Sequence, residues 1–237
     1  MSRGCGDPHP AERCRAVELW SADHLAALVA TVLAAAALIA GARRRGGDWP
    51  AARHALATVL LAGFAGEQLT YALRGDWSAE VNLPFQLTDA VTLVGIVALW
   101  RPTPLRCELV YFWALSASLQ AVLTPDLGYA FPDVLYFTYF ATHAGAIAAA
   151  CLLVFGEGRV PRPGAVPRVY AITAAFAVCA GLATLATGGN YMYLRRKPAQ
   201  DSLLDVMGPW PVYILTAAAL ALALFGALAA VAKWTRR

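Results

Sequence analysis

Three polar side chains lie close together where the sequence otherwise indicates a membrane-spanning helix. Gln86, Thr88 and Asp89 belong to the segment NLPFQLTD at residues 82–89. An acidic residue at the centre of a bilayer helix costs roughly 2.5 to 3.5 kcal/mol on insertion scales, so a membrane protein that keeps one usually has a use for it. The segment therefore predicts a polar site within the membrane.

Two further titratable side chains lie inside apolar segments. Glu67 shares a helical face with Gly63, which is small enough to let a neighbouring helix approach closely, so Glu67 is expected to point at protein and not at lipid. His143 is the one histidine deep in any apolar segment. A histidine among carboxyl groups suits a proton relay, and it equally suits a structural hydrogen bond to Glu67, Asp89 or Gln120.

Seven apolar runs of about 20 residues hold these side chains. The chain has 237 residues, of which 59% are hydrophobic and 14% charged, a balance that excludes an ordinary soluble domain. The first run ends in Arg43, Arg44 and Arg45, so we interpret it as a retained helix and not as a secretory signal. We predict an all-α, polytopic membrane protein with transmembrane helices at 21–41, 52–73, 84–100, 106–123, 134–155, 167–187 and 212–232. Residues 1–20 are then an extracytoplasmic tail, 21–232 the transmembrane domain, and 233–237 a cytoplasmic basic tail.

Basic residues in the connections indicate an orientation, because cytoplasmic loops carry an excess of lysine and arginine. One side holds twelve: Arg43, Arg44, Arg45, Arg53, Arg101, Arg106, Arg159, Arg162, Arg168, Lys233, Arg236 and Arg237. The other side holds seven: Arg3, Arg13, Arg15, Arg74, Arg195, Arg196 and Lys197. We expect the N-terminus outside and the C-terminus in the cytoplasm. The positive charge then reflects topology and contact with membrane lipids, and no nucleic-acid partner is expected.

On this topology, polar residues from several helices fall at one level, in the outer half of the membrane or at its outer edge. They are Glu67, Gln86, Thr88, Asp89, Gln120, Asp126, His143 and Asn190. Polar residues without a function would be scattered over different depths of the membrane. The agreement predicts a functional cavity that opens outward.

The connection at residues 188–213 is too rich in Asn, Tyr and Trp for a passive linker. Asn190 and Tyr191 could close the cavity. Arg195 and Lys197 stand on the outer side against the charge bias, which makes them candidates for binding a lipid phosphate or a substrate carboxylate; a solvated basic loop is the alternative.

Five cysteines are scattered without the spacing of a metal site. Cys5 and Cys14 could pair in an oxidising compartment, and the cysteines within helices are expected to pack as small apolar residues. No metal or cofactor is expected.

Several segments resemble the YwaF-type bacterial integral membrane proteins. They are NLPFQLTD, YFWALSASLQAVLTPDL at 111–127, FPDVLYFTYFATH at 131–143, NYMYLRRKP and SLLDVMGPWPVY. The resemblance covers roughly the second to the seventh helix and implies a multi-pass protein of a bacterial inner membrane. That family is similar to eukaryotic intramembrane lipid enzymes, which include a phospholipid acyltransferase with Cys and His and the threonine hydrolases of the androgen-induced-gene group. The implied reaction is acyl transfer or ester hydrolysis on a lipid.

By position, the resemblance puts the catalytic histidine on His143 and the nucleophile on Thr88. Many YwaF-type sequences have Cys there and often a preceding His, where this chain has Thr88 and Gln86. The departure either removes a Cys-His reaction or replaces it with the Thr-His version. By helical rise, Thr88 lies roughly 6 Å and His143 roughly 13 Å below their helix starts, which counts against direct contact.

In the Thr-His version, Thr88 attacks an acyl carbonyl and His143 removes and later returns its proton. Asp89 or Glu67 would orient the imidazole, and Asn190 or a backbone N–H would hold the oxyanion. The alternative for Thr88 is a hydroxyl bonded to its own helix.

Two other classes of function stay open. In a transporter or ligand-binding membrane protein, Glu67, Asp89 and His143 would bind a proton or a small solute, although the chain shows no repeated half. In a structural protein, the polar residues would only hold helices together.

Overall fold

The computed structural model describes residues 16–199 and 202–234, and this part of the chain contains helices and connections but no strand. Cys5 and Cys14 lie outside the described residues. In chain order the helices are α1 (Ala22–Arg44), α2 (Pro50–Arg74), α3 (Leu87–Trp100), α4 (Pro104–Trp113), η1 (Ala114–Ser118), α5 (Leu119–Leu123), α6 (Val134–Cys151), η2 (Leu152–Gly156), α7 (Ala165–Thr187), η3 (Tyr191–Tyr193), η4 (Leu203–Met207) and α8 (Val212–Trp234).

Five helices are long and apolar enough to cross a membrane: α1, α2, α6 continued by η2, α7 and α8. The third predicted span is shorter than expected. Helix α3 has 14 residues, or about 21 Å at the α-helical rise, against about 30 Å for a hydrocarbon core. It starts at Leu87 because Gln86 is extended, with a ψ of 146°. Helices α4, η1 and α5 follow one another as a rod over residues 104–123, and η1 is a π-helical turn inside it.

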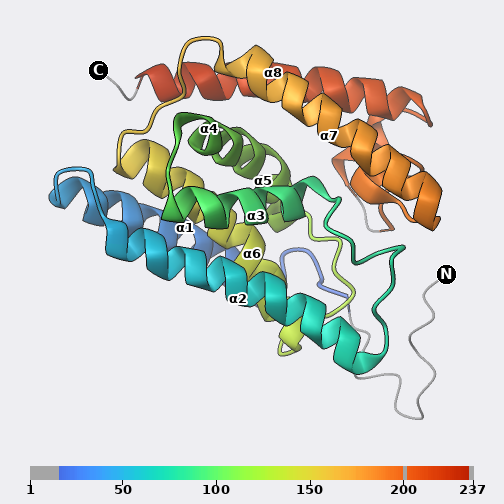
Figure 1. Ribbon diagram of the computed structural model, residues 1–237. Coiled ribbons are helices and arrows are strands. Elements are labelled where there is room, and N and C mark those ends of the chain that lie inside the picture. Colours follow the sequence, from blue (N-terminus) through green and yellow to red (C-terminus); the bar gives the residue numbers. More distant parts are fainter. Residues whose placement is uncertain (1–15, 200–201, 235–237) are drawn as a thin grey trace.

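Helix α6 lies at the centre of the bundle. In its most apolar stretch 72% of the residues are buried, against 17% or less for α1, α2, α7 and α8. It packs against α1, α2, α3 and the rod, while α7 pairs with α8. Figure 1 shows α7 and α8 running side by side along one edge of the bundle, with α3, α4 and α5 between them and α2. The four long outer helices thus offer their apolar side chains to lipid.

Leu60 of α2 lies against both α3 and α6 and so shows which residues of the three helices are at the same depth in the bundle. A Cβ atom on Gly95 of α3 would lie 3.3 Å from one Leu60 methyl group, and one on Gly145 of α6 would lie 2.8 Å from the other. Glycine is therefore what lets α3 and α6 approach α2 here. Because α3 and α6 run in the same direction, Thr88 of α3 is level with residue 138 of α6.

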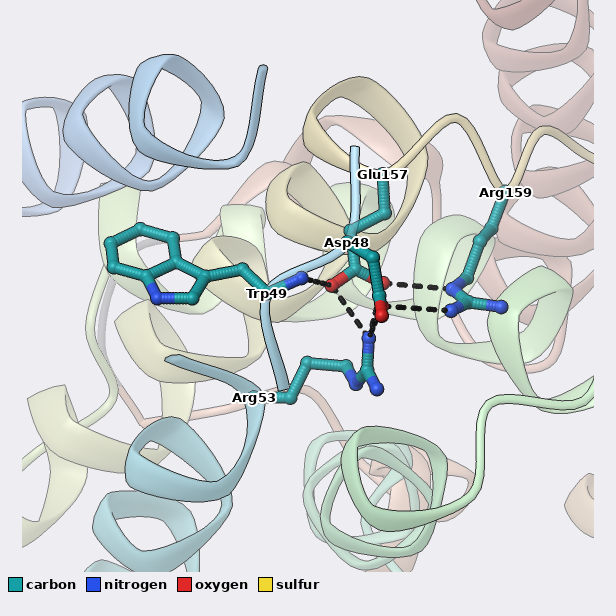
Figure 2. Close-up of polar contacts among 5 residues, drawn as sticks. All are labelled: Asp48, Trp49, Arg53, Glu157 and Arg159. Carbon is teal, nitrogen blue, oxygen red and sulfur yellow. Dashed lines mark hydrogen bonds and ion pairs between the residues drawn. The ribbon is translucent and has the colours of Figure 1, made fainter. Parts of the chain in front are cut away.

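Two buried carboxylates gather the basic connections at one end of the bundle, which we call the arginine end. There α1 and α6 end while α2, α4 and α7 begin. Glu157 is fully buried and binds Arg53 at 2.7 Å and Arg159 at 2.8 Å, and Asp48 completes the group (Figure 2). The second carboxylate, Glu108, binds Arg162 at 2.8 Å and Arg168 at 2.7 Å. Four of the arginines that the charge pattern assigned to one side, Arg53, Arg159, Arg162 and Arg168, thus lie at this end of the bundle.

Candidate functional site

The predicted polar residues lie at the opposite end, where α2 ends and α3 and α6 begin. Thr88 is the second residue of α3. Its carbonyl accepts a hydrogen bond from the buried Thr92 hydroxyl at 2.9 Å, so Thr92, and not Thr88, has its hydroxyl bonded to the helix. Within the described residues, the Thr88 hydroxyl makes no hydrogen bond.

The first turn of α3 also leaves backbone donors unused. Asp89 and Ala90 donate their N–H groups to the Gln86 carbonyl at 3.1 Å. The N–H groups of Leu87 and Thr88 donate to no acceptor in the described part of the chain, as is usual at a helix start. The site therefore combines a free hydroxyl with two free N–H groups at the positive end of a helix dipole.

Two neighbours of Thr88 fix the start of its helix. The Asp89 carboxylate accepts from the Gln86 backbone N–H at 3.2 Å, which makes Asp89 a capping residue. The Gln86 side chain accepts from the Met192 N–H at 2.8 Å, 106 residues along the chain. Met192 and Tyr193 have φ angles of 51° and 54°, a left-handed conformation that non-glycine residues rarely adopt. Gln86 thus ties a strained loop to the helix that carries Thr88.

His143 is oriented by its own helix. Its Nδ1 lies 2.8 Å from the Tyr139 carbonyl oxygen, and its ring stacks on the Tyr139 ring with centroids 4.0 Å apart. Because a carbonyl only accepts hydrogen bonds, Nδ1 carries the proton, and in the neutral ring Nε2 keeps a free lone pair. Among the described residues no carboxyl group bonds to His143: the imidazole is oriented by Tyr139, and not by Asp89 or Glu67.

Thr88 and His143 are not in hydrogen-bond contact. From the level set by Leu60, the His143 backbone lies five residues deeper than Thr88, or about 7 Å by helical rise. The imidazole reduces this offset because it leans back over the preceding turn onto Tyr139. The two functional groups therefore lie at neighbouring levels of the bundle without touching each other.

Glu67 lies on α2 at the level of Thr88. Its half-buried carboxyl group makes no hydrogen bond or ion pair with the described residues, but it interacts electrostatically with the Asp89 carboxyl group. Tyr193 reaches the same region from the loop, where it interacts with Asp89 and donates a hydrogen bond to the Asp126 carboxylate at 2.9 Å. Burial, together with Asp126, raises the pKa of Tyr193, so the phenol keeps its proton.

The loop residues proposed from sequence mostly bind one another. Asn190 accepts from the N–H groups of Arg195 and Arg196 at 3.1 Å and donates to the Arg196 carbonyl at 2.9 Å. The Tyr191 hydroxyl is bonded to Ala79 and Leu83, so it packs the loop against the entry to α3.

The basic residues of this loop also have protein partners. Arg195 is exposed and donates to the Gly188 carbonyl at 3.3 Å. Lys197 lies 3.9 Å from the Asp205 carboxylate. Their roles in ligand binding stay predictions.

Gln120 lies near the end of the rod and donates to the Thr124 hydroxyl at 2.6 Å. Sequence reasoning missed its neighbour Ser118, which is 0% exposed and whose hydroxyl lacks a hydrogen-bond partner among the described residues. Ser118 ends the π-helical turn, where the Ala114 carbonyl accepts from the Leu119 N–H. Such a turn has no simple sequence signal, although it is frequent at functional sites.

A comparison with protein families matches most of the chain. Residues 19–229 match the TMEM164 family, an integral membrane family. No curated protein and no solved structure matches the chain. The match extends over every helix that carries a candidate residue, and it supports a multi-pass membrane protein; the YwaF-type name and the likeness to lipid enzymes stay predictions.

Proposed function

The chain belongs to the TMEM164 family, and we propose that it is an intramembrane enzyme that hydrolyses or transfers an acyl group of a lipid, with Thr88 as nucleophile. The observation that carries this proposal is the first turn of α3. It presents an unbonded hydroxyl beside two N–H groups without acceptors in the described chain. Nucleophile and oxyanion donors on one rigid turn are what acyl transfer requires.

In the proposed reaction, His143 Nε2 takes the proton of the Thr88 hydroxyl through one intervening water, since the two groups are not in contact, while the Thr88 oxygen attacks the ester carbonyl. The N–H groups of Leu87 and Thr88 and the helix dipole stabilise the tetrahedral oxyanion. The imidazolium returns the proton to the leaving alcohol as the ester bond breaks. Water or the hydroxyl of a second lipid then attacks the acyl-threonine, again with His143 as base.

Other residues have supporting roles in this proposal. Asp89 caps the helix that carries Thr88, and Gln86 holds the loop of Met192 over it. Glu67 and Tyr193 line the region where a polar headgroup would enter. We propose seven spans, in which α3 and the rod of residues 104–123 complete the five long helices. The arginine end then faces the cytoplasm and the site faces outward, as the charge bias indicates.

The proposal is tested by incubating purified protein with phospholipids and analysing the lipids by mass spectrometry. Thr88→Ala and His143→Ala should each abolish acyl release or transfer, with a loss of about 10³-fold or more. Thr92→Ala is the matched control, because its hydroxyl is bonded within the same helix. Equal activity of Thr88→Ala and wild type would overturn the proposal.

A second candidate function is proton-coupled binding or transport of a small solute, and Glu67 favours it. Its carboxyl group has no bonded partner in the described chain and interacts electrostatically with Asp89. A half-buried carboxyl pair of this kind suits proton uptake. In proteoliposomes, Asp89→Asn and Glu67→Gln should then abolish pH-dependent uptake while substrate binding persists.

A further inference from the structure

A cavity of about 500 Å³ lies at the arginine end, away from the proposed catalytic site. It is lined by the last residues of η2 and by the start of the following connection, and Arg43 and Gly47 close it from α1 and the turn after it. Helix α1 carries exposed apolar side chains, among them Val29, Val32 and Leu33. The cavity therefore lies at the end of a helix whose flank is suited to lipid.

The cavity is lined by two charged residues, Glu157 and Arg43, and only Glu157 has partners of opposite charge among the described residues. Glu157 lines it, but its carboxylate is fully buried and accepts from the Trp49 N–H, from Arg53 and from Arg159 (Figure 2). The Asp48 carboxylate pairs with the same two arginines, and the hydrogen bond from Arg53 lowers its pKa. Two acids and two arginines thus cancel, and Arg43 supplies an uncompensated charge.

The Arg43 guanidinium is held in place with its outer edge unused. Its Nε donates to the Phe155 carbonyl at 3.0 Å. Neither Nη atom has an acceptor in the part of the chain that the structure describes. A guanidinium anchored in this way presents two parallel N–H groups, the arrangement that binds phosphate bidentately. Gly158 adds a backbone N–H that is likewise without an acceptor among the described residues, and nothing lies within 4 Å of the Cβ position at Gly158.

We propose that this cavity binds the phosphate of an anionic lipid headgroup through Arg43, with the Gly158 N–H as a second donor. The bound lipid would bridge the end of α1 to the end of α6. This site is independent of the chemistry proposed at Thr88.

The test measures binding by the shift in the thermal unfolding midpoint of the full-length protein in detergent. The probes are dihexanoyl phosphatidylglycerol, dihexanoyl phosphatidylcholine and inorganic phosphate. Arg43→Gln is compared with Arg44→Gln, which removes the same charge from a neighbouring position that does not line the cavity. Arg43→Lys keeps the charge but lacks the two parallel N–H groups of the guanidinium. This variant replaces Arg43→Gln in the test if Arg43→Gln does not fold.

We expect saturable stabilisation by phosphatidylglycerol in wild type and Arg44→Gln, weakened at least tenfold in apparent affinity in both Arg43 variants. Equal responses of the Arg43 and Arg44 variants would overturn the site. Equal responses to the two lipids would overturn its preference for an anionic headgroup. Saturation by inorganic phosphate at the same concentration would identify a free anion and overturn the lipid as ligand.

Discussion

The Nδ1 atom of His143 lies 2.8 Å from the carbonyl oxygen of Tyr139, one helical turn earlier. This bond sets the tautomer of the imidazole, since only a protonated Nδ1 can donate to a carbonyl. It also leaves the Nε2 lone pair of the neutral ring free. In the proposed reaction, the Tyr139 carbonyl would orient the imidazole as a carboxylate does in a serine-hydrolase triad.

The tautomer of His143 can be measured directly. In protein labelled with ¹⁵N-histidine, we expect the neutral His143 ring to carry its proton on Nδ1, because the Tyr139 carbonyl is its acceptor. The signal is assigned by its absence in His143→Ala. A neutral ring protonated on Nε2 would contradict the arrangement and would remove the lone pair that the proposed reaction needs.

Gln86 should stabilise the loop that follows α7. Gln86→Ala removes the acceptor of the Met192 N–H, so we expect a loss of about 1 kcal/mol in the free energy of unfolding. Gln86→Glu keeps an oxygen at that position and should retain the bond. Chemical denaturation in detergent measures both variants, and equal destabilisation by the two would rule out the bond as the cause.

The approach of α6 to α2 should depend on Gly145. Gly145→Ala places a Cβ 2.8 Å from a Leu60 methyl group, so we expect destabilisation of about 1 to 3 kcal/mol from overpacking. The matched control is Gly226→Ala on α8, where nothing lies within 4 Å of the Cβ position. Comparable unfolding midpoints for the two variants would show that Leu60 does not set this spacing.

The contribution of Asp48 to the stability of the arginine end should depend on pH. Its pKa is lowered from 3.8, chiefly by the hydrogen bond from Arg53. A lowered pKa means that the stabilisation is complete above about pH 4 and is lost as the pH falls through the folded-state value. We expect the unfolding midpoints of wild type and Asp48→Asn to differ at pH 7 and to converge below pH 4. A difference between the two unfolding midpoints that increases as the pH falls would contradict this prediction.

The sequence predicted the helical architecture because long apolar runs are local signals. The fifth run was expected at 134–155, and α6 continued by η2 extends over Val134–Gly156. The third run was expected from residue 84, but the cap at Gln86 delays the helix to Leu87. Five spans are supported by length and composition.

The contacts that define the site could not be predicted from local sequence patterns. The bond from Met192 to Gln86 joins residues 106 positions apart, and the ion pair of Arg53 with Glu157 joins residues 104 apart. Such pairings depend on how the helices pack and not on local pattern. The free hydroxyl of Ser118 depends on a π-helical turn, which periodicity does not reveal.

The measurement that tests the central claim most directly is the mapping of a fluorophosphonate adduct by peptide mass spectrometry on the protein in lipid. We expect a single adduct on Thr88 in wild type and in Thr92→Ala, and none in His143→Ala. An adduct on another residue, or none in a folded wild-type protein, would contradict a Thr88 nucleophile and would turn attention to solute binding at Glu67 and Asp89.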